Sequence, residues 1–296
     1  MVPPVDRDIT RVGVVGHVEL VEFARVERVP QPGEIIHAQS FFTEPGGGGA
    51  VAAVQLRRLA GEALFLTALG TGHDAELCAE QLRDRYGVTV YAGSRPGPQR
   101  RTFTFLDDAA ERTITVLGER IVPHRSDALP WEDLAELDGI YLTGGDAEAV
   151  CAARAARVLV ATPRAMGVLQ ASGVCLDVLV GSANDPGESY EAGMLEPAPR
   201  VIVRTRGALG GTWELGGPGP ADVPWVPEGA RAGKWLATAL PGPPVDAYGC
   251  GDSFAAALAY GLGAGMMLDA AIELAARCGA ACLTGRGPYA AQLTLA

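Results

Sequence analysis

The sequence predicts an α/β fold with a central, mostly parallel β-sheet and a second, smaller sheet. Short apolar runs alternate with helix-like segments along most of the 296 residues, and this alternation is typical of a parallel sheet covered by helices. Two segments, residues 34–42 and 101–116, interrupt it with alternating strand-like residues. The second has a turn at Asp107 and Asp108, so it predicts a β-hairpin that projects from the main sheet; a hairpin that extends the edge of that sheet is the alternative.

The elements of the main layer follow from the spacing of their apolar residues. Short apolar runs predict buried strands, and apolar residues three and four positions apart predict helices. The expected strands lie at 11–16, 64–69, 88–91, 139–142, 158–160, 178–180 and 201–203, and the expected helices at 50–60, 75–86, 146–156 and 252–262. Residues 216–244 are rich in proline and glycine, which predicts a surface excursion without regular structure.

Composition limits the classes of function. Apolar residues make up 48% of the chain, and its formal net charge is −11. A chain of this length can bury a full core, and we expect one domain over residues 1–296. The negative charge argues against binding to nucleic acid or to an anionic membrane, and neither a long apolar run nor a signal-peptide pattern occurs. The sequence therefore predicts a soluble, cytoplasmic protein with a small-molecule substrate.

The stretch that ends at Asp252 predicts a phosphate site. Gly249, Cys250 and Gly251 precede an alanine-rich, apolar helix, whose first N–H groups have no partner within the helix. Such amides, at the positive end of the helix dipole, bind phosphate, and glycine lets the backbone approach a ligand closely. Asp252 at the edge of this site can accept a proton from a substrate hydroxyl. A simple N-cap of the helix is its alternative role.

Three further glycine motifs precede this stretch. Residues 46–50 read Gly-Gly-Gly-Gly-Ala, residues 70–74 read Gly-Thr-Gly-His-Asp, and residues 205–210 read Thr-Arg-Gly-Ala-Leu-Gly. Together with Asp246-Ala-Tyr-Gly-Cys-Gly-Asp252 they resemble, in order and spacing, the signatures of the ribokinase-like, or PfkB, family of carbohydrate kinases. The resemblance covers nearly all of the chain. It implies a three-layer ribokinase-like fold with a small β-sheet lid, whose strands would come from about 17–42 and 100–117.

The resemblance also implies phosphoryl transfer from ATP. Asp252 would be the general base, and the amides of Gly249, Cys250 and Gly251 would stabilise charge on the transferring group. Mg²⁺ would accompany ATP. The residues implied to border the nucleotide are Thr205, Gly207, Gly210 and Ala276, with Ser182 and Asp185 near Mg²⁺; Asn184 and Glu188 are the alternative pair. The residues implied to hold a monovalent cation such as K⁺ are Asp246, Tyr248, Cys282, Gly285 and Gly287. Some relatives form homodimers through the lid.

The acceptor side departs from the family pattern at two positions. An Asp and an Asn that contact sugar hydroxyls in the family are replaced by Val21 and Val51, and each lost polar partner costs about 1–3 kcal/mol. These valines, beside Gly47 and Gly48 of the glycine run, predict an acceptor pocket more apolar than usual. We expect Glu19 and His17 to take over these contacts with the acceptor; a plain solvent-exposed side chain is the alternative role of Glu19.

The sequence therefore predicts an ATP-dependent kinase that phosphorylates a hydroxyl group of a small metabolite, a sugar or sugar derivative, with an apolar or aromatic part. A nucleoside kinase is one alternative. Another is a catalytically weak relative that binds nucleotide as a sensor or scaffold. A dinucleotide-binding oxidoreductase is disfavoured, because no Gly-x-Gly-x-x-Gly motif follows the first strand.

Overall fold

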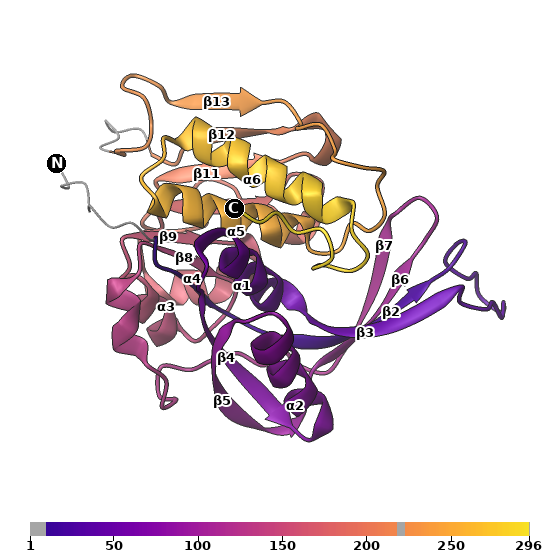
Figure 1. The fold of residues 1–296 in the computed structure, drawn as a ribbon. Helices are drawn as coiled ribbons and strands as arrows, with labels where there is room; N and C mark the ends of the chain where they lie inside the picture. The colour runs from indigo at the N-terminus through magenta and orange to yellow at the C-terminus, as the bar shows by residue number, and fades with distance from the viewer. Residues whose placement is uncertain (1–9, 218–222, 296) are drawn as a thin grey trace.

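The body of the protein is built around a nine-stranded sheet (Figure 1). The computed structural model describes residues 10–217 and 223–295. The strands run in the order β13-β12-β11-β10-β9-β8-β1-β4-β5, and neighbours are parallel except β12, which is antiparallel to β11 and to β13. The strands are β1 (Val12–Val15), β4 (Leu64–Thr71), β5 (Thr89–Pro98), β8 (Gly139–Leu142), β9 (Val158–Ala161), β10 (Val178–Ser182), β11 (Val201–Thr205), β12 (Gly211–Leu215) and β13 (Ala232–Trp235).

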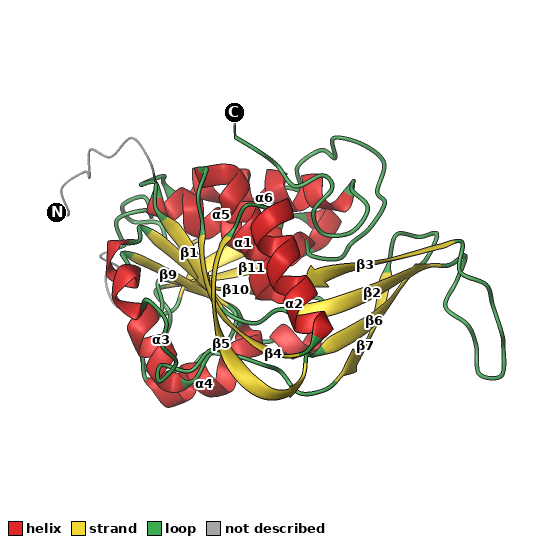
Figure 2. Ribbon diagram, turned by 60° about the horizontal axis from the view of Figure 1, so that its bottom comes forward, coloured by secondary structure: helices red, strands yellow, loops and turns green. Residues whose placement is uncertain are grey.

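Helices cover both faces of this sheet and give three layers (Figure 2). On one side lie α1 (Gly47–Ala60), α2 (His73–Glu80), α5 (Cys250–Gly263) and α6 (Leu268–Leu283), and on the other side α3 (Ala147–Ala153) and α4 (Met166–Ser172). A π-helix at Gln81–Arg85 continues α2, and 3-10 helices lie at Trp131–Glu136, Pro163–Ala165, Pro186–Glu188 and Gly207–Leu209. In the part of the chain that the structure describes, no helix combines the length and apolar character that crossing a bilayer requires.

Alternation along the central strands builds a separate core on each face of the sheet. In β9, Val158 and Val160 join the core that contains α1 and α5, whereas Leu159 joins the core that contains α3. Successive side chains of a strand point to opposite faces, so a strand covered on both faces needs apolar residues at every position. This is why the sequence shows these strands as continuous apolar runs.

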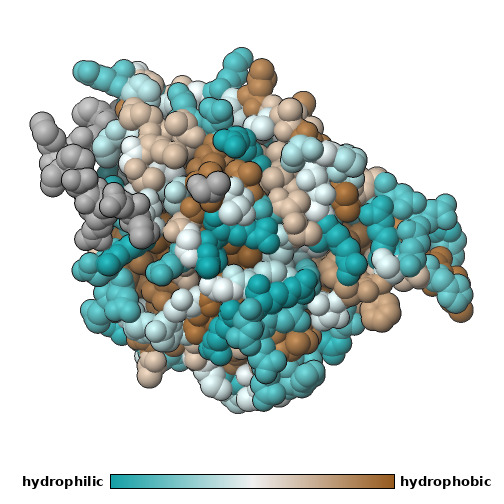
Figure 3. All heavy atoms as spheres, in the orientation of Figure 1, coloured by the Kyte–Doolittle hydropathy of each residue, from teal (hydrophilic) through white to brown (hydrophobic). Residues whose placement is uncertain are grey.

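A second, four-stranded sheet projects from the body (Figure 1). It has the order β3-β2-β6-β7 and consists of β2 (Glu19–Arg25), β3 (Ser40–Gly46), β6 (Arg101–Leu106) and β7 (Arg112–Leu117). Strands β6 and β7 form the predicted hairpin, and because they pair within this small sheet, the alternative of an edge hairpin on the main sheet is wrong. In the space-filling view the projection is mainly hydrophilic, with hydrophobic side chains at its outer end (Figure 3).

Two expectations about secondary structure need correction. Residues 34–39 form no strand, although the segment 34–42 has a strand-like pattern, because this stretch is largely exposed and strand β3 begins only at Ser40. The expected irregular excursion at 216–244 contains strand β13, which pairs with β12. Residues 218–222 of that excursion lie outside the described residues.

Candidate active site

Two glycine-rich segments meet next to the first turn of α5. A Cβ atom at Gly48, in the first turn of α1, would lie 2.6 Å from Oδ1 of Asp252. A Cβ atom at Gly249 would lie 2.9 Å from a methyl group of Val51. Neither position has room for a side chain, so glycine is what allows α1 and α5 to approach each other here. The predicted glycine run and the predicted phosphate motif therefore belong to one site.

The N-terminus of α5 presents free backbone amides. Gly249 is the N-cap residue and has φ of +83°, in the left-handed region that favours glycine. No described residue accepts a hydrogen bond from the N–H groups of Gly249, Cys250 or Gly251. A Cβ atom at Gly251 would meet nothing within 4 Å, so there is open space next to this residue. Free amides at the positive end of a helix dipole are suited to bind phosphate.

Asp252 lies in the first helical turn of α5, after the N-cap. The N-cap position belongs to Gly249, so the alternative that Asp252 only caps the helix is wrong. The hydroxyl of Tyr141 donates a hydrogen bond of 3.4 Å to Oδ1 of Asp252. Burial and, next, the negative charge of Glu188 raise the pKa of Asp252 to about 6. A carboxylate with such a pKa is suited to accept a proton from a hydroxyl group near neutral pH.

The start of the small sheet brings a buried ion pair to this site. Glu19 is 6% exposed, and its Oε2 lies 2.8 Å from Nε of Arg100. The hydroxyl of Tyr248 donates to Oε1 of Glu19 over 3.4 Å and accepts a hydrogen bond of 2.9 Å from the N–H of Gly47. Burial raises the pKa of Glu19, and the positive charge of Arg100 opposes that rise. Glu19 is therefore not the solvent-exposed side chain that the sequence left as an alternative.

Val21 and Val51 pack in the core. Neither side chain has exposed surface. Neither valine therefore contributes apolar surface to the predicted acceptor pocket. The backbone carbonyl of Val51 accepts a hydrogen bond of 3.0 Å from Nε2 of Gln292, which also donates to the Ser253 hydroxyl over 3.1 Å. Gln292 thus joins α1 to α5 directly behind the site.

The residues expected to border the nucleotide fall into separate groups. Ser182 and Thr205 are neighbours at the ends of β10 and β11, and Gly207 and Gly210 lie in the turn that follows β11. A cavity of about 310 Å³ at the end of β10 is lined by Ser182 and Asp185, among others, but not by the other expected nucleotide residues. Ala276 lies apart from this cavity, on α6.

The two acidic residues after β10 have different environments. Glu188 accepts hydrogen bonds from the N–H of Ser182 over 2.7 Å and from Nε of Arg164 over 2.8 Å. Asp185 caps the following 3-10 helix and also pairs with Arg164. Glu188 is the charged residue with the largest effect on the pKa of Asp252. Of the two acidic residues, Glu188 therefore acts more strongly on Asp252; which of the two pairs accompanies Mg²⁺ stays a prediction.

A buried carboxylate lies behind the start of α5. Asp246 has no exposed surface, and its two oxygens accept hydrogen bonds from the N–H groups of Tyr248, at 2.8 Å, and Gly287, at 2.9 Å. Cys282 contacts the Tyr248 carbonyl through its thiol over 3.5 Å and accepts a hydrogen bond from the N–H of Gly285 over 3.1 Å. The five residues expected at a monovalent cation thus lie together. Burial raises the pKa of Asp246, which indicates a carboxylate that lacks a close counter-charge.

Four residues of this site were not predicted from the sequence, namely Thr143, Arg100, Arg120 and Arg164. Oγ1 of Thr143 lies 3.4 Å from Nδ1 of His17, and burial, followed by the charges of Arg120, Arg100 and Arg164, lowers the pKa of His17 well below its usual value. Thr143 and Arg164 follow strands β8 and β9 closely. Residues after the carboxyl ends of parallel strands commonly line a site. The positions of the expected strands could therefore have indicated Thr143 and Arg164. Arg120 had no comparable signal.

The chain is similar in sequence to carbohydrate kinases. The sequence model of the pfkB family of carbohydrate kinases matches residues 9–178 and 225–295. A ribokinase of Staphylococcus aureus (strain COL) is 29% identical over 113 residues, a segment that spans 36% of this chain and 36% of the relative.

Solved structures share the fold over nearly the whole length. The ribokinase from Thermotoga maritima has a TM-score of 0.72 at 20% identity, and the match covers 96% of each chain. The Arabidopsis thaliana ribokinase, solved in complex with ribose and ATP, has a TM-score of 0.69 at 19% identity, again over 96% of each chain. These likenesses confirm the three-layer fold with its small second sheet.

Proposed function

The chain belongs to the pfkB family of carbohydrate kinases, and we propose that it transfers the γ-phosphoryl group of ATP to a hydroxyl group of a small sugar or sugar derivative. The observation that carries this proposal is the position of Asp252, with its pKa of about 6, beside three unpaired backbone amides. A carboxylate next to an anion site is repelled by the anion, so its presence needs a chemical reason. Proton transfer supplies one, whereas a protein that only binds nucleotide would gain nothing from this carboxylate.

In the proposed reaction, Asp252 accepts the proton of the acceptor hydroxyl while that oxygen attacks the γ-phosphorus. The bond between this phosphorus and the β,γ-bridging oxygen breaks, and ADP leaves. The N–H groups of Gly249, Cys250 and Gly251 donate to oxygens of the transferring group and stabilise its charge without reorganisation. The hydrogen bond from Tyr141 orients the carboxylate.

The donor groups of the site fit the two ions that this chemistry uses. Mg²⁺ prefers oxygen ligands and, when bound, neutralises the polyphosphate; Glu188 is the carboxylate that would hold it together with phosphate oxygens. A monovalent cation such as K⁺ suits the buried oxygens around Asp246, where it would supply the missing counter-charge.

The small sheet would serve as a lid. Glu19 belongs to β2 and Arg100 directly precedes β6, so movement of the small sheet would move both side chains relative to Asp252. Closure would exclude water and so protect the phosphoryl group from hydrolysis. The outer strands of this sheet, β3 and β7, pair on one side only and carry the exposed Phe41 and Ile114. A homodimer through these strands remains a prediction.

We expect the acid limb of the pH profile to report Asp252. The base acts only when ionised, so kcat/KM should fall about tenfold per unit as the pH drops below about 6, and level off above it. Initial rates from pH 4.5 to 8.5, measured by direct detection of the phosphorylated product, would check this. A profile that stays flat down to pH 5 would contradict the assignment.

Glu188→Gln should move that limb to lower pH. Removal of the negative charge that raises the pKa of Asp252 makes the carboxylate easier to ionise. The quantity to compare is the pH at which kcat/KM begins to fall, not the maximal rate. The maximal rate would also change if Glu188 holds Mg²⁺. An unchanged limb in this variant would show that Glu188 does not act on the titrating group.

A panel of acceptors tests the proposed function. Purified protein with ATP would be offered sugars, sugar acids, sugar phosphates and nucleosides, with and without Mg²⁺ and K⁺, and ADP release and product mass would be measured. We expect turnover of at least one sugar or sugar derivative, dependent on Mg²⁺. Nucleoside turnover alone would favour the nucleoside kinase, and nucleotide binding without any turnover would favour the sensor.

A further inference from the structure

Three arginines from separate segments surround the site. Arg100 precedes β6, Arg120 lies between β7 and β8, and Arg164 lies in the 3-10 helix after β9. All three lie close enough to His17 for their charges to lower its pKa, after the larger effect of burial. The whole chain has a formal net charge of −11, so a cluster of positive charge here is a local feature that the composition does not impose.

Among the described residues, two of these arginines form ion pairs with acidic side chains, and the third, Arg120, does not. Arg100 pairs with Glu19, and Arg164 pairs with Glu188 and with Asp185. No acidic side chain of residues 10–217 or 223–295 lies within 4 Å of the Arg120 guanidinium. Its Nη1 donates a hydrogen bond of 3.2 Å to the carbonyl oxygen of Arg164. The remaining N–H groups of this half-buried side chain are left for a ligand.

The unpaired charge of Arg120 is unfavourable without a ligand. Burial and, next, the charge of Arg100 lower the pKa of Arg120, although Glu19 and Asp252 partly oppose this effect. A guanidinium that is desolvated next to another cation regains free energy when an anion binds, and its planar fork matches a carboxylate or phosphate with two parallel hydrogen bonds.

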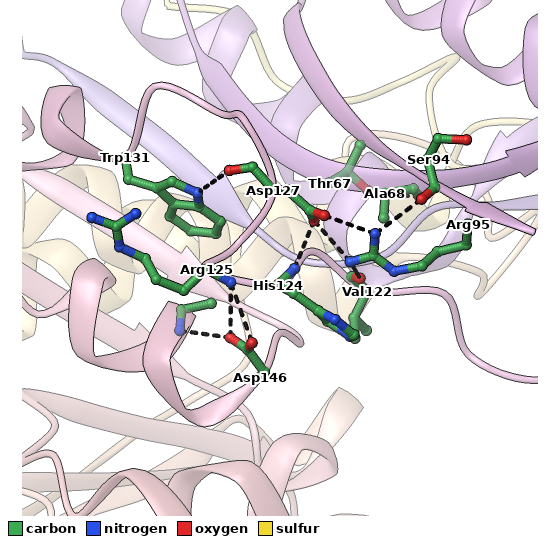
Figure 4. Close-up of polar contacts among 11 residues, drawn as sticks. Thr67, Ala68, Ser94, Arg95, Val122, His124, Arg125, Asp127, Trp131 and Asp146 are labelled. Carbon is green, nitrogen blue, oxygen red and sulfur yellow. Dashed lines mark hydrogen bonds and ion pairs between the residues drawn. The ribbon is translucent and has the colours of Figure 1, made fainter.

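The segment that carries Arg120 is fixed to the body (Figure 4). Arg95 donates to the carbonyl oxygen of Val122 over 3.0 Å and to both oxygens of Asp127 over 2.8 Å. Asp127 also accepts from the N–H of His124 over 2.8 Å. Because Val122 is only two residues after Arg120, these contacts hold the backbone of Arg120 in place, which reduces the entropy that binding would cost.

We propose that the acceptor carries an anionic group, a carboxylate or a phosphate, which binds between Arg120 and Arg100 while the reacting hydroxyl faces Asp252. This inference rests on the proposed function and narrows its substrate to sugar acids or sugar phosphates. Adjacent residues of α1 place Arg100 beside Asp252: a Cβ atom at Gly47 would lie 3.3 Å from Cγ of Glu19, the partner of Arg100, and one at Gly48 would lie 2.6 Å from Oδ1 of Asp252. The γ-phosphate of ATP is the other anion that would bind Arg120. The second experiment below distinguishes binding of this phosphate from binding of the anionic group of the acceptor.

The first experiment compares matched acceptors. Pairs that share a carbon skeleton, such as an aldose, its aldonate and its terminal phosphate, would be assayed at saturating ATP. We expect at least one anionic member to have kcat/KM at least about tenfold above its neutral partner, because a charge-assisted hydrogen bond contributes that much. The carboxylate and phosphate arms show which anion is used. A neutral partner that equals or exceeds both anions overturns the inference and leaves the proposed function intact.

The second experiment removes the guanidinium. Arg120→Ala should raise the KM of the anionic acceptor by about 10- to 100-fold, change the KM of ATP by less than about threefold, and hardly affect a neutral acceptor. Arg120→Lys should recover part of the loss. Arg11→Ala is the matched control, because this half-exposed arginine pairs with Glu136 near the other end of β1. A rise in the KM of ATP instead would assign Arg120 to the γ-phosphate and overturn the inference.

Binding gives a readout that does not depend on turnover. Calorimetric titration of the Asp252→Asn protein with each acceptor should show the anion preference directly, with affinity that weakens as salt increases. Binding of anions by wild-type protein that never releases ADP would refute the proposed function while supporting the anionic ligand. Equal binding of neutral and anionic partners would refute the anionic ligand alone.

Discussion

Asp252→Asn is expected to lower the rate of phosphoryl transfer by about 100- to 10,000-fold, the range that a positioned general base contributes. The amide has nearly the same shape, but it cannot accept the proton of the acceptor hydroxyl. The hydrogen bond from Tyr141 can persist, because the amide oxygen also accepts. Nucleotide affinity should stay within about threefold, since the backbone amides at 249–251 are unchanged. Single-turnover assays and calorimetric ATP titration would measure both quantities.

The matched control for this variant is Asp269→Asn. Asp269 lies in the first turn of the neighbouring helix α6 and is exposed, so the same substitution there should leave the rate within about twofold. The general-base assignment would be refuted by wild-type turnover of the Asp252→Asn protein. Loss of ATP binding in parallel with activity would assign Asp252 to nucleotide binding instead.

Gly249→Ala should damage both the fold and the activity. Its φ of +83° lies in a region that costs an alanine about 1–2 kcal/mol, and the new Cβ atom would lie 2.9 Å from Val51 and 3.1 Å from Pro288. We expect a total loss of roughly 2–4 kcal/mol in the free energy of unfolding. Displacement of the amide donors should lower kcat by at least about 100-fold. Thermal unfolding and steady-state kinetics check the two parts.

Gly265→Ala separates the two causes of that loss. Gly265 also has φ of +83°, but a Cβ atom there would meet nothing within 4 Å. This control should therefore show the backbone strain alone, with a smaller drop in the midpoint of thermal unfolding and normal kinetics. If both variants lost the same stability and Gly249→Ala remained active, the close packing of Gly249 would have no role in the site.

The main sheet could be predicted because both of its faces are covered, which forces apolar residues at every strand position. Strand β13 could not, because three residues of its sequence Ala-Gly-Lys-Trp are poor strand formers. It is a strand because β12 offers it a free edge. The residues of β13 themselves do not show that the edge of β12 is available for pairing.

The candidate site divides in the same way. Its phosphate end could be predicted, because the backbone conformation at the start of α5 requires a glycine at position 249. This glycine is visible in the sequence. Its acceptor end depends on side chains from distant segments, so nothing local marks Arg120. The valines at 21 and 51 predict that two polar anchors of the family are absent, and this stays a prediction. They could not indicate that these positions are fully buried.

The bridge formed by Gln292 determines when the site can first exist during synthesis. Its side-chain amide joins the carbonyl of Val51 to the hydroxyl of Ser253, and 241 positions separate Gln292 from Val51. Contacts this distant in sequence form late in folding, because a long loop must close before they form. A nascent chain that has exposed α1 and α5 but not Gln292 lacks the side chain that joins these two helices. The complete site should therefore form only after Gln292 has emerged from the ribosome.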